Sequence, residues 1–205
     1  MYNENYIKAK EILAKRKSAS HDQNEARTPP GQVITQRFPI LDLGIKPVFD
    51  PKTWRLRVYG LVVERFFSYE EILNMPRTEF TEDFHCVTRW SKQDVKWAGV
   101  LFSEFIKIIK PREEWKFLIQ EGMEGYTANV SREDLSNALL AYELEGKPLP
   151  TEHGAPLRII IPHLYAWKGS KFLKGLKFTD KDEPGFWEVR GYHSRGNAWK
   201  EERYS

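Results

Sequence analysis

The chain has 205 residues, of which 40% are apolar and 14% aromatic, so it can build the core of one large domain. Its charged fraction of 30% is typical of a folded soluble protein and excludes a largely disordered one. The net charge of +3 permits an anionic ligand but does not indicate nucleic acid, and a single cysteine excludes both an intramolecular disulfide and a cysteine-rich zinc site.

The N-terminal part predicts a short charged helix within residues 1–20. Its apolar stripe would comprise Tyr2, Tyr6, Ala9 and Leu13. The polar stretch HDQNEARTPPG ends in prolines and a glycine and predicts a linker. We therefore expect residues 1–30 to form a helix with its linker, and residues 31–205 to form one domain.

The next segments predict strands interleaved with short helices. The alternation in TWRLRVYGLV, residues 53–62, predicts a half-buried strand. Ser68 and Glu71 form a capping box for a helix that stops at Pro76.

A second capping pattern, Ser131 with Asp134, predicts another helix over residues 132–142. Further strands are predicted at WKFLIQ (115–120), PLRIIIP (156–162) and KFLKGLKFTD (171–180). This succession predicts an α+β fold, a single compact domain with a mixed and mostly non-parallel sheet.

The only cysteine lies in FHCVTRWSKQDVKWAGV, residues 84–100. A lone Cys86 is most often a small apolar core residue. Its thiolate is also a soft metal ligand, although one thiolate cannot close a structural site, so other ligands must come from histidines or a cofactor. His85 lies on the opposite strand face, which leaves His163 or His193 as partners in a zinc or copper site.

A cationic segment, residues 152–178, carries positive side chains next to two glycines. They are Arg158, Lys168, Lys171 and Lys174, with Gly154 and Gly169. Such donors suit a phosphate or another oxyanion, and they are equally typical of surface charges on strands.

The segment EGMEGYTANV, residues 121–130, predicts a glycine turn, and the tail PGFWEVRGYHSRGNAWKEERY is rich in aromatic and basic residues. The tail could stack on nucleobases or cap the core. From the residues alone an enzyme, a non-catalytic module for anions or nucleic acid, and a small zinc or copper site all stay open.

Taken together, the Cys86 segment, HGAPLRIIIPHLYAWKGSKFLKGLKF and PGFWEVRGYH resemble the molybdopterin-binding domain of the sulfite oxidase family. The resemblance covers about residues 33–204 and is greatest to stand-alone bacterial and archaeal oxidoreductases. It implies a mononuclear molybdenum, or tungsten as in some relatives, held by one molybdopterin dithiolene and one protein cysteine. Cys86 matches that cysteine, and because the pterin supplies two further sulfurs, a single cysteine is sufficient.

The resemblance also assigns other residues to roles. Those implied to contact the cofactor are His153, Arg158, Gly169, Ser170, Lys171 and Thr127. Arg37 and Tyr192 fall at positions implied to be catalytic or to line the substrate site. The tail is then expected to cover the metal pocket, with Arg190 or Arg195 near its mouth.

The implied activity is oxygen-atom transfer to or from a small oxyanion, S-oxide or N-oxide, with an external electron carrier. The resemblance does not extend to the haem domain of animal sulfite oxidases or to the family's immunoglobulin-like domain, and the arginines that clamp sulfite are not recognisable. With no apolar run of the roughly 20 residues that span a bilayer, and no secretory segment, we expect a cytoplasmic monomer that does not span a membrane and does not bind nucleic acid.

Overall fold

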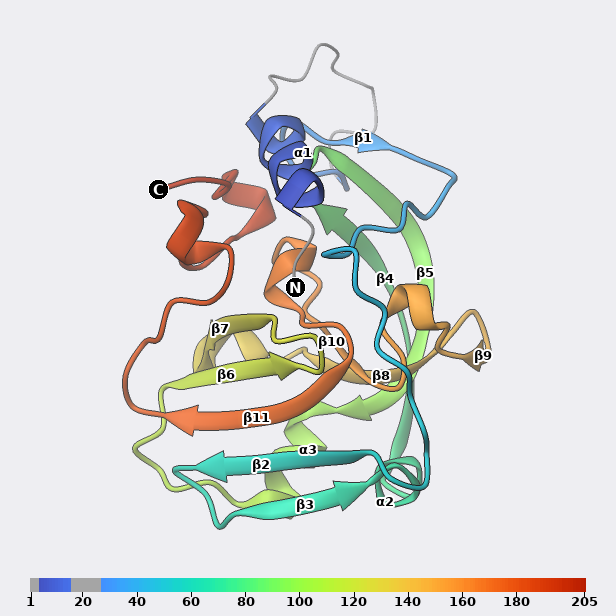
Figure 1. Ribbon diagram of the computed structural model, residues 1–205, viewed down its shortest axis with the longest axis vertical. Helices are drawn as coiled ribbons and strands as arrows, with labels where there is room; N and C mark the ends of the chain where they lie inside the picture. The colour runs from blue at the N-terminus through green and yellow to red at the C-terminus, as the bar shows by residue number, and fades with distance from the viewer. Residues whose placement is uncertain (1–3, 16–26) are drawn as a thin grey trace.

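The computed structural model describes residues 4–15 and 27–205, whose strands form two sheets. The β5 sheet contains β1 (Val33–Ile34), β4 (Arg77–Cys86), β5 (Trp90–Leu101), β8 (Leu139–Leu144), β9 (Lys147–Pro148) and β10 (Arg158–Ile160). The β11 sheet contains β3 (Arg65–Ser68), β2 (Arg55–Gly60), β11 (Leu173–Thr179), β6 (Phe117–Gly122) and β7 (Thr127–Ser131), in that order (Figure 1). The pairs β1–β5 and β11–β2 are parallel and the other pairs in the described residues are antiparallel, which confirms the predicted mixed fold.

The strands predicted from the sequence are present in both sheets. In β2 the side chains of Leu56 and Val58 are buried, whereas Arg55 and Arg57 are exposed, so the predicted alternation is confirmed. The predicted strands at WKFLIQ, PLRIIIP and KFLKGLKFTD correspond to β6, β10 and β11.

Short helices connect the strands. They are α1 (Glu4–Lys15), α2 (Tyr69–Leu73) and α3 (Phe102–Ile109), with 3-10 turns at Arg132–Leu135, Thr151–His153, Ala166–Lys168, Glu188–Arg190 and Ala198–Lys200. The capping box of α2 is confirmed, because the Glu71 amide donates to Ser68 Oγ and the Ser68 amide donates to the Glu71 carboxylate. The helix ends at Leu73, three residues before Pro76.

The predicted helix over residues 132–142 is wrong. Only Arg132–Leu135 is helical, and the chain then enters β8. Asp134 does not cap the helix, since its carboxylate accepts hydrogen bonds from the Ser131 hydroxyl and from Arg195. Alternate residues of β8 face two different apolar clusters, so both faces are buried, and the continuous apolar run that results cannot be distinguished from a helix by periodicity.

The main core lies between the two sheets. Leu56 and Phe178 of the β11 sheet belong to the same cluster as Leu140 of the β5 sheet and Phe105 of α3. A second apolar cluster surrounds Cys86 and draws in residues from both ends of the chain. The second cluster positions the site described below.

Helix α1 packs on the C-terminal tail, through a hydrogen bond from the Tyr204 hydroxyl to the Glu11 carbonyl at 3.3 Å (Figure 1). Its buried side chain is Ile7, whereas Ala9 and Leu13 are exposed, so the predicted stripe is wrong for these two residues. Tyr2 and the side chain of Tyr6 lie outside the described residues. The division at residue 30 stays a prediction.

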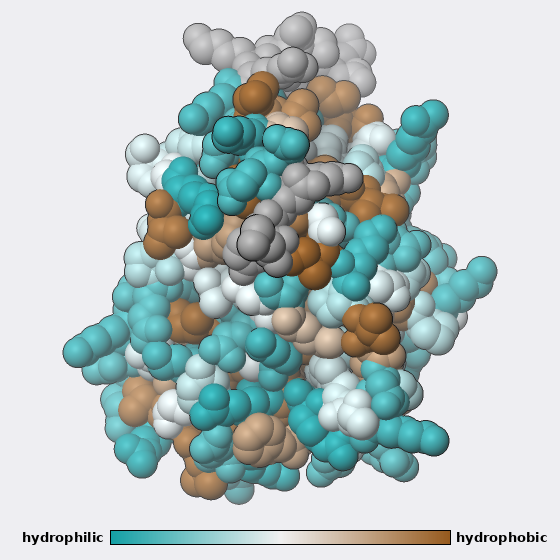
Figure 2. All heavy atoms as spheres, viewed as in Figure 1, coloured by the Kyte–Doolittle hydropathy of each residue, from teal (hydrophilic) through white to brown (hydrophobic). Residues whose placement is uncertain are grey.

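The surface shown in Figure 2 mixes hydrophilic side chains with isolated apolar ones. Individual exposed apolar residues such as Val48 and Val63 are ordinary for a folded protein. None of the helices in the two described ranges is long and apolar enough to cross a membrane.

Candidate cofactor site

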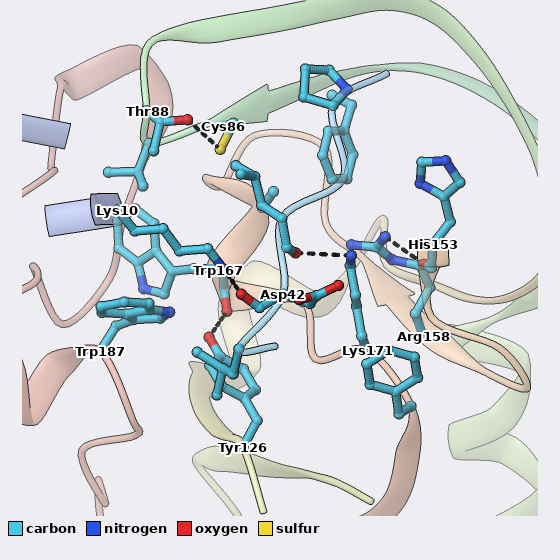
Figure 3. Close-up of a pocket in the computed structure, with 18 of the residues that line it drawn as sticks. Lys10, Asp42, Cys86, Thr88, Tyr126, His153, Arg158, Trp167, Lys171 and Trp187 are labelled. Carbon is cyan, nitrogen blue, oxygen red and sulfur yellow. Dashed lines mark hydrogen bonds between the residues drawn. The ribbon is translucent and has the colours of Figure 1, made fainter. Parts of the chain in front are cut away.

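A cavity of about 800 Å³, including its open mouth, lies beside the apolar cluster around Cys86. Its walls come from α1, the segment 38–43, the end of β4, the β6–β7 turn, residues 153–172 and the tail. Figure 3 shows the cavity with Lys10 and Trp187 at one end and His153 and Arg158 at the other.

Cys86 is the last residue of β4 and pairs with Trp90, the first residue of β5. The loop between them has three residues and closes with Arg89 in the left-handed region, at φ 71°, as expected for a tight hairpin of this length. Cys86 is 7% exposed and lines the cavity, and its sulfur lies 3.1 Å from Thr88 Oγ1.

The cysteine loop is held in place by side chains from two distant segments. The Gln32 amide donates to the Cys86 carbonyl at 3.0 Å, and Arg203 donates to the Val87 carbonyl at 2.7 Å. Arg203 also bonds to the Pro30 carbonyl and lies 4.7 Å from the centre of the Tyr165 ring. These contacts fix the direction of the thiol.

Burial raises the pKa of the Cys86 thiol, while the Thr88 hydrogen bonds and the positive charges of Lys10 and Lys171 oppose that rise. A buried thiol ionises when it coordinates a metal ion, because the ion supplies the compensating charge. Cys86 can therefore act as a metal ligand without being a reactive free thiolate.

Two cations, Arg158 and Lys171, project into the cavity away from Lys10 and Trp187 (Figure 3). Arg158 is 2% exposed, donates to the His153 carbonyl at 2.8 Å, and has an Nε with no partner among the described residues. Lys171 donates to the Leu41 and Glu152 carbonyls. Within the described residues neither cation has a carboxylate at ion-pair distance.

Burial is the main cause of the lowered pKa values at this end of the cavity. It brings the pKa of Arg158 to about 9 and that of Lys171 to about 7. Burial, together with the two neighbouring cations, also lowers the pKa of His153 to about 4, so its imidazole is neutral at pH 7. An anion placed among these groups would favour their charged forms.

Two glycines shape the same end. A Cβ at Gly169 would lie 2.1 Å from the Ile159 carbonyl oxygen, so no side chain fits there. Gly154 has φ 114° and lies against the Lys171 side chain, which passes it on the way into the cavity.

The end near Lys10 is walled by aromatic rings from the tail. Tyr192 stacks on Trp187 with centroids 4.7 Å apart, and its ring meets the edge of Trp167 at 5.1 Å. Tyr192 is 1% exposed, and burial with the neighbouring Tyr204 raises the pKa of its phenol far above the usual range. The tail thus covers this end of the cavity, as predicted.

Three predicted site residues do not line the cavity: Arg37, Thr127 and Ser170. In each case an adjacent residue does, namely Phe38, Tyr126, and Gly169 with Lys171. Neighbouring side chains of an extended chain point to opposite sides, so an alignment that is one residue out of register selects the wrong face. Ser170 instead bonds through its amide to the Gln120 side chain.

Other cations of the predicted segment face elsewhere. The Lys168 ammonium is buried against Glu188, Asn129 and the Ser194 carbonyl, and Lys174 is exposed. Arg195 pairs with Asp134, and Arg190 lies over the Phe186 ring, so neither stands at the mouth.

A zinc or copper site at Cys86 is not supported by the positions of the histidines. His85 bonds to Ser91 on the other strand face, and His163 bonds to Asp134. His193 does not line the cavity either, and no group of three or more His, Cys, Asp or Glu residues in the described ranges could hold a metal ion.

Sequence reasoning missed several residues of the cavity. They include Lys10, Phe38, Asp42, Thr88, Glu124, Tyr126 and Trp187. Tyr126 and Trp187 lie inside segments singled out in the sequence, but Lys10 lies on a helix face that the apolar pattern did not mark. Glu124 has a buried Oε2 without a partner among the described residues, and burial raises its pKa to about 7.

The donor set fits a molybdopterin group. One soft sulfur, Cys86, enters a cavity whose far end holds the unpaired Arg158 Nε and the partly buried Lys171 ammonium. The thiolate suits molybdenum, and the cations, with the neutral His153 and the amide-exposing glycines, suit the terminal phosphate. The roles of individual residues stay predictions.

Comparison with known proteins agrees with this fit. The family described as the oxidoreductase molybdopterin binding domain matches residues 43–187. The chain is 42% identical over 193 residues to the uncharacterized oxidoreductase YuiH of Bacillus subtilis, covering 92% of this chain and 97% of that protein. It is also 26% identical to the protein-methionine-sulfoxide reductase catalytic subunit MsrP of Ralstonia nicotianae, over 71% of this chain and 50% of that subunit.

Among solved structures, the fold is similar to that of the sulfane dehydrogenase SoxCD from Paracoccus pantotrophus. The TM-score is 0.60 at 23% identity, over 66% of this chain and 40% of that one. From the match over most of its length, the chain belongs to the oxidoreductase molybdopterin-binding domain family, and it is a molybdopterin oxidoreductase of the sulfite oxidase type.

Proposed function

We propose that the protein catalyses oxygen-atom transfer at sulfur and reduces a small S-oxide to the sulfide. The proposal rests on the different side chains at the two ends of the cavity. Cys86 lies on the side of Lys10 and Trp187, while the cations that suit the cofactor phosphate lie at the other end (Figure 3). A substrate bound at the end with Lys10 and Trp187 would therefore lie next to Cys86 and away from the phosphate.

The reaction consumes two electrons and two protons and releases water as the S–O bond breaks. When bound, molybdenum of the cofactor supplies the two-electron redox chemistry. Cys86 would hold the metal, and Arg158, Lys171 and His153 would hold the phosphate. An external electron carrier or partner subunit would supply the electrons, and several relatives are named as subunits.

The other cavity residues would position the substrate and exclude water. Trp187 and Tyr192 form an apolar wall against which a sulfide body can pack. The Tyr192 phenol would donate a hydrogen bond to the S-oxide oxygen. The Glu124 carboxyl lines the cavity and, with its raised pKa, would hold a proton near neutral pH.

The names of the relatives support the same chemistry. MsrP and the putative subunit YedZ1 of Azospira oryzae, which is 27% identical over 179 residues, are named for reduction of methionine sulfoxide in proteins. The chain spans half of MsrP and 66% of YedZ1, so their substrates are extended to it here as part of the proposal.

The test is an anaerobic substrate panel on protein produced with molybdenum cofactor. Reduced viologen dye is mixed with S-oxides, N-oxides or nitrate, and oxidised dye is mixed with sulfite. We expect dye oxidation with S-oxides. Sulfite-dependent dye reduction without S-oxide activity would show that the enzyme oxidises its substrate rather than reducing it. Dye oxidation with N-oxides alone would show that the reaction does not take place at sulfur.

A further inference from the structure

Helix α1 supplies part of the cavity wall, although it lies far from the rest of the site in sequence and outside residues 43–187. Ile7 is 3% exposed within the apolar cluster of Cys86, and Lys10 lines the cavity. On its other side the helix is fixed to the tail by the Glu11–Tyr204 hydrogen bond. The helix is therefore part of the binding site.

The Lys10 ammonium donates to the backbone carbonyl of Asp42. None of the described carboxylates lies at ion-pair distance from it. Burial lowers its pKa to about 8, so it carries a charge at pH 7. Because an ammonium has three donors, Lys10 retains donors for an anion in the cavity.

Lys10 lies apart from Arg158 and His153 (Figure 3), although, in addition to burial, its charge still contributes to the lowered pKa of Lys171. Figure 3 shows it beside Trp187 and on the Cys86 side, with Arg158 and His153 at the far end. A phosphate held by Arg158 and Lys171 therefore leaves Lys10 as the cation of the substrate end.

Polar groups near Lys10 in the cavity are Thr88 and Asp42 (Figure 3), and the Asp42 charge favours the charged ammonium, but much of the wall at this end is apolar. Trp187, Tyr192 and Trp167 form the wall, and the aliphatic Leu43 also lines the cavity. A small inorganic oxyanion would leave this wall without contacts. An S-oxide with an apolar body and one negative group would use both the rings and the ammonium.

We propose that Lys10 is a specificity-determining residue that binds the negative group of the substrate, an inference that rests on the proposed function. The substrate class is then a small S-oxide that carries one carboxylate or sulfonate on an apolar body.

The experiment compares a matched pair of substrates, methyl phenyl sulfoxide and 4-(methylsulfinyl)benzoate, which differ by one carboxylate. Lys10→Gln should raise KM for the benzoate about tenfold or more, as loss of a charge-assisted hydrogen bond predicts, with little change in kcat or in KM for the neutral sulfoxide. Lys10→Arg should restore much of the difference. Lys8→Gln, an exposed lysine of the same helix, should behave as wild type.

Binding is also measured without turnover, by equilibrium dialysis of 4-(methylsulfinyl)benzoate against the oxidised holoenzyme. A higher Kd in Lys10→Gln, at unchanged molybdenum content, supports the inference even if neither sulfoxide is reduced. Failure to reduce either sulfoxide would count against the proposed function alone. An unchanged Kd, an equal effect on both sulfoxides, or loss of molybdenum in Lys10→Gln would overturn the inference.

Discussion

At the scale of single residues, Arg158 is unusual because its guanidinium is buried without a carboxylate partner among the described residues. A guanidinium that is 2% exposed normally has a carboxylate partner, because an uncompensated buried charge is costly. Here its neighbours are the rings of Phe84 and Trp97 and one carbonyl, while Nε stays unpaired. An anionic group bound in the cavity would supply the missing partner.

We predict that Arg158→Ala and Lys171→Ala lower the cofactor content of the protein. The turnover rate of the molecules that still hold cofactor should not change. A charge-assisted hydrogen bond contributes about 1.5–3 kcal/mol, so each change should weaken cofactor binding by one or two orders of magnitude. Molybdenum and pterin content per chain is the measurement. Lys174→Ala, an exposed lysine of the same segment, is the matched control and should keep wild-type content. Full occupancy in both cavity variants would show that neither residue binds the phosphate.

Glu124 gives a prediction about pH. Burial raises its pKa from the ordinary 4.5 to about 7, so between these values the folded chain binds more protons than the unfolded one. The free energy of unfolding therefore falls as pH rises from about 4.5 to about 7. Glu124→Gln, which mimics the protonated form, should be more stable than wild type at pH 8 and similar to it at pH 5.

The measurement for Glu124 is urea unfolding of the cofactor-free protein at both pH values. A stability difference that is the same at pH 5 and pH 8 would mean that the carboxyl does not titrate with the raised pKa.

At the scale of elements, the β4–β5 hairpin carries Cys86, the proposed metal ligand, and the C-terminal tail holds the hairpin through Arg203. Because Arg203 is 4% exposed and donates to two carbonyls, Arg203→Met should lower the free energy of unfolding by about 2 kcal/mol, or several degrees in Tm. Thermal unfolding checks this value. Lys200→Met, an exposed position in the same tail, serves as control. An equal Tm for the two variants would show that the Arg203 hydrogen bonds do not stabilise the hairpin.

The elements also show which sequence signals are informative. The half-buried β2 and the capping box of α2 follow from local pattern, because one face of each is solvent-exposed. Strand β8 was predicted as helix because its burial on both faces removes the periodicity. For the site, Cys86, His153, Arg158, Gly169, Lys171 and Tyr192 lie in one cavity as the family resemblance implied.

Lys10 could not have been predicted in the same way. Its role depends on how α1 docks against the tail, which is a contact between the two ends of the chain. Neither residue pattern nor family match covers that contact, since the matched family ends at residue 187.

At the scale of the whole molecule, the two sheets build one core, and the cavity opens beside it where both chain ends meet. This arrangement places the proposed metal ligand at the end of β4, the proposed phosphate cations in β10 and just before β11, and the proposed substrate wall on the tail and α1. The predicted monomeric state and cytoplasmic location stay predictions.

The central claim is that Cys86 coordinates molybdenum in this cavity, and X-ray absorption at the molybdenum edge tests it most directly. Cys86→Ser should keep pterin, because Arg158, Lys171 and His153 still hold its phosphate, and a hydroxyl is a poor replacement for thiolate on this metal. The account predicts one fewer sulfur neighbour at molybdenum in Cys86→Ser than in wild type, together with loss of activity. The same number of sulfur neighbours in both proteins, with molybdenum retained and turnover intact, would contradict it.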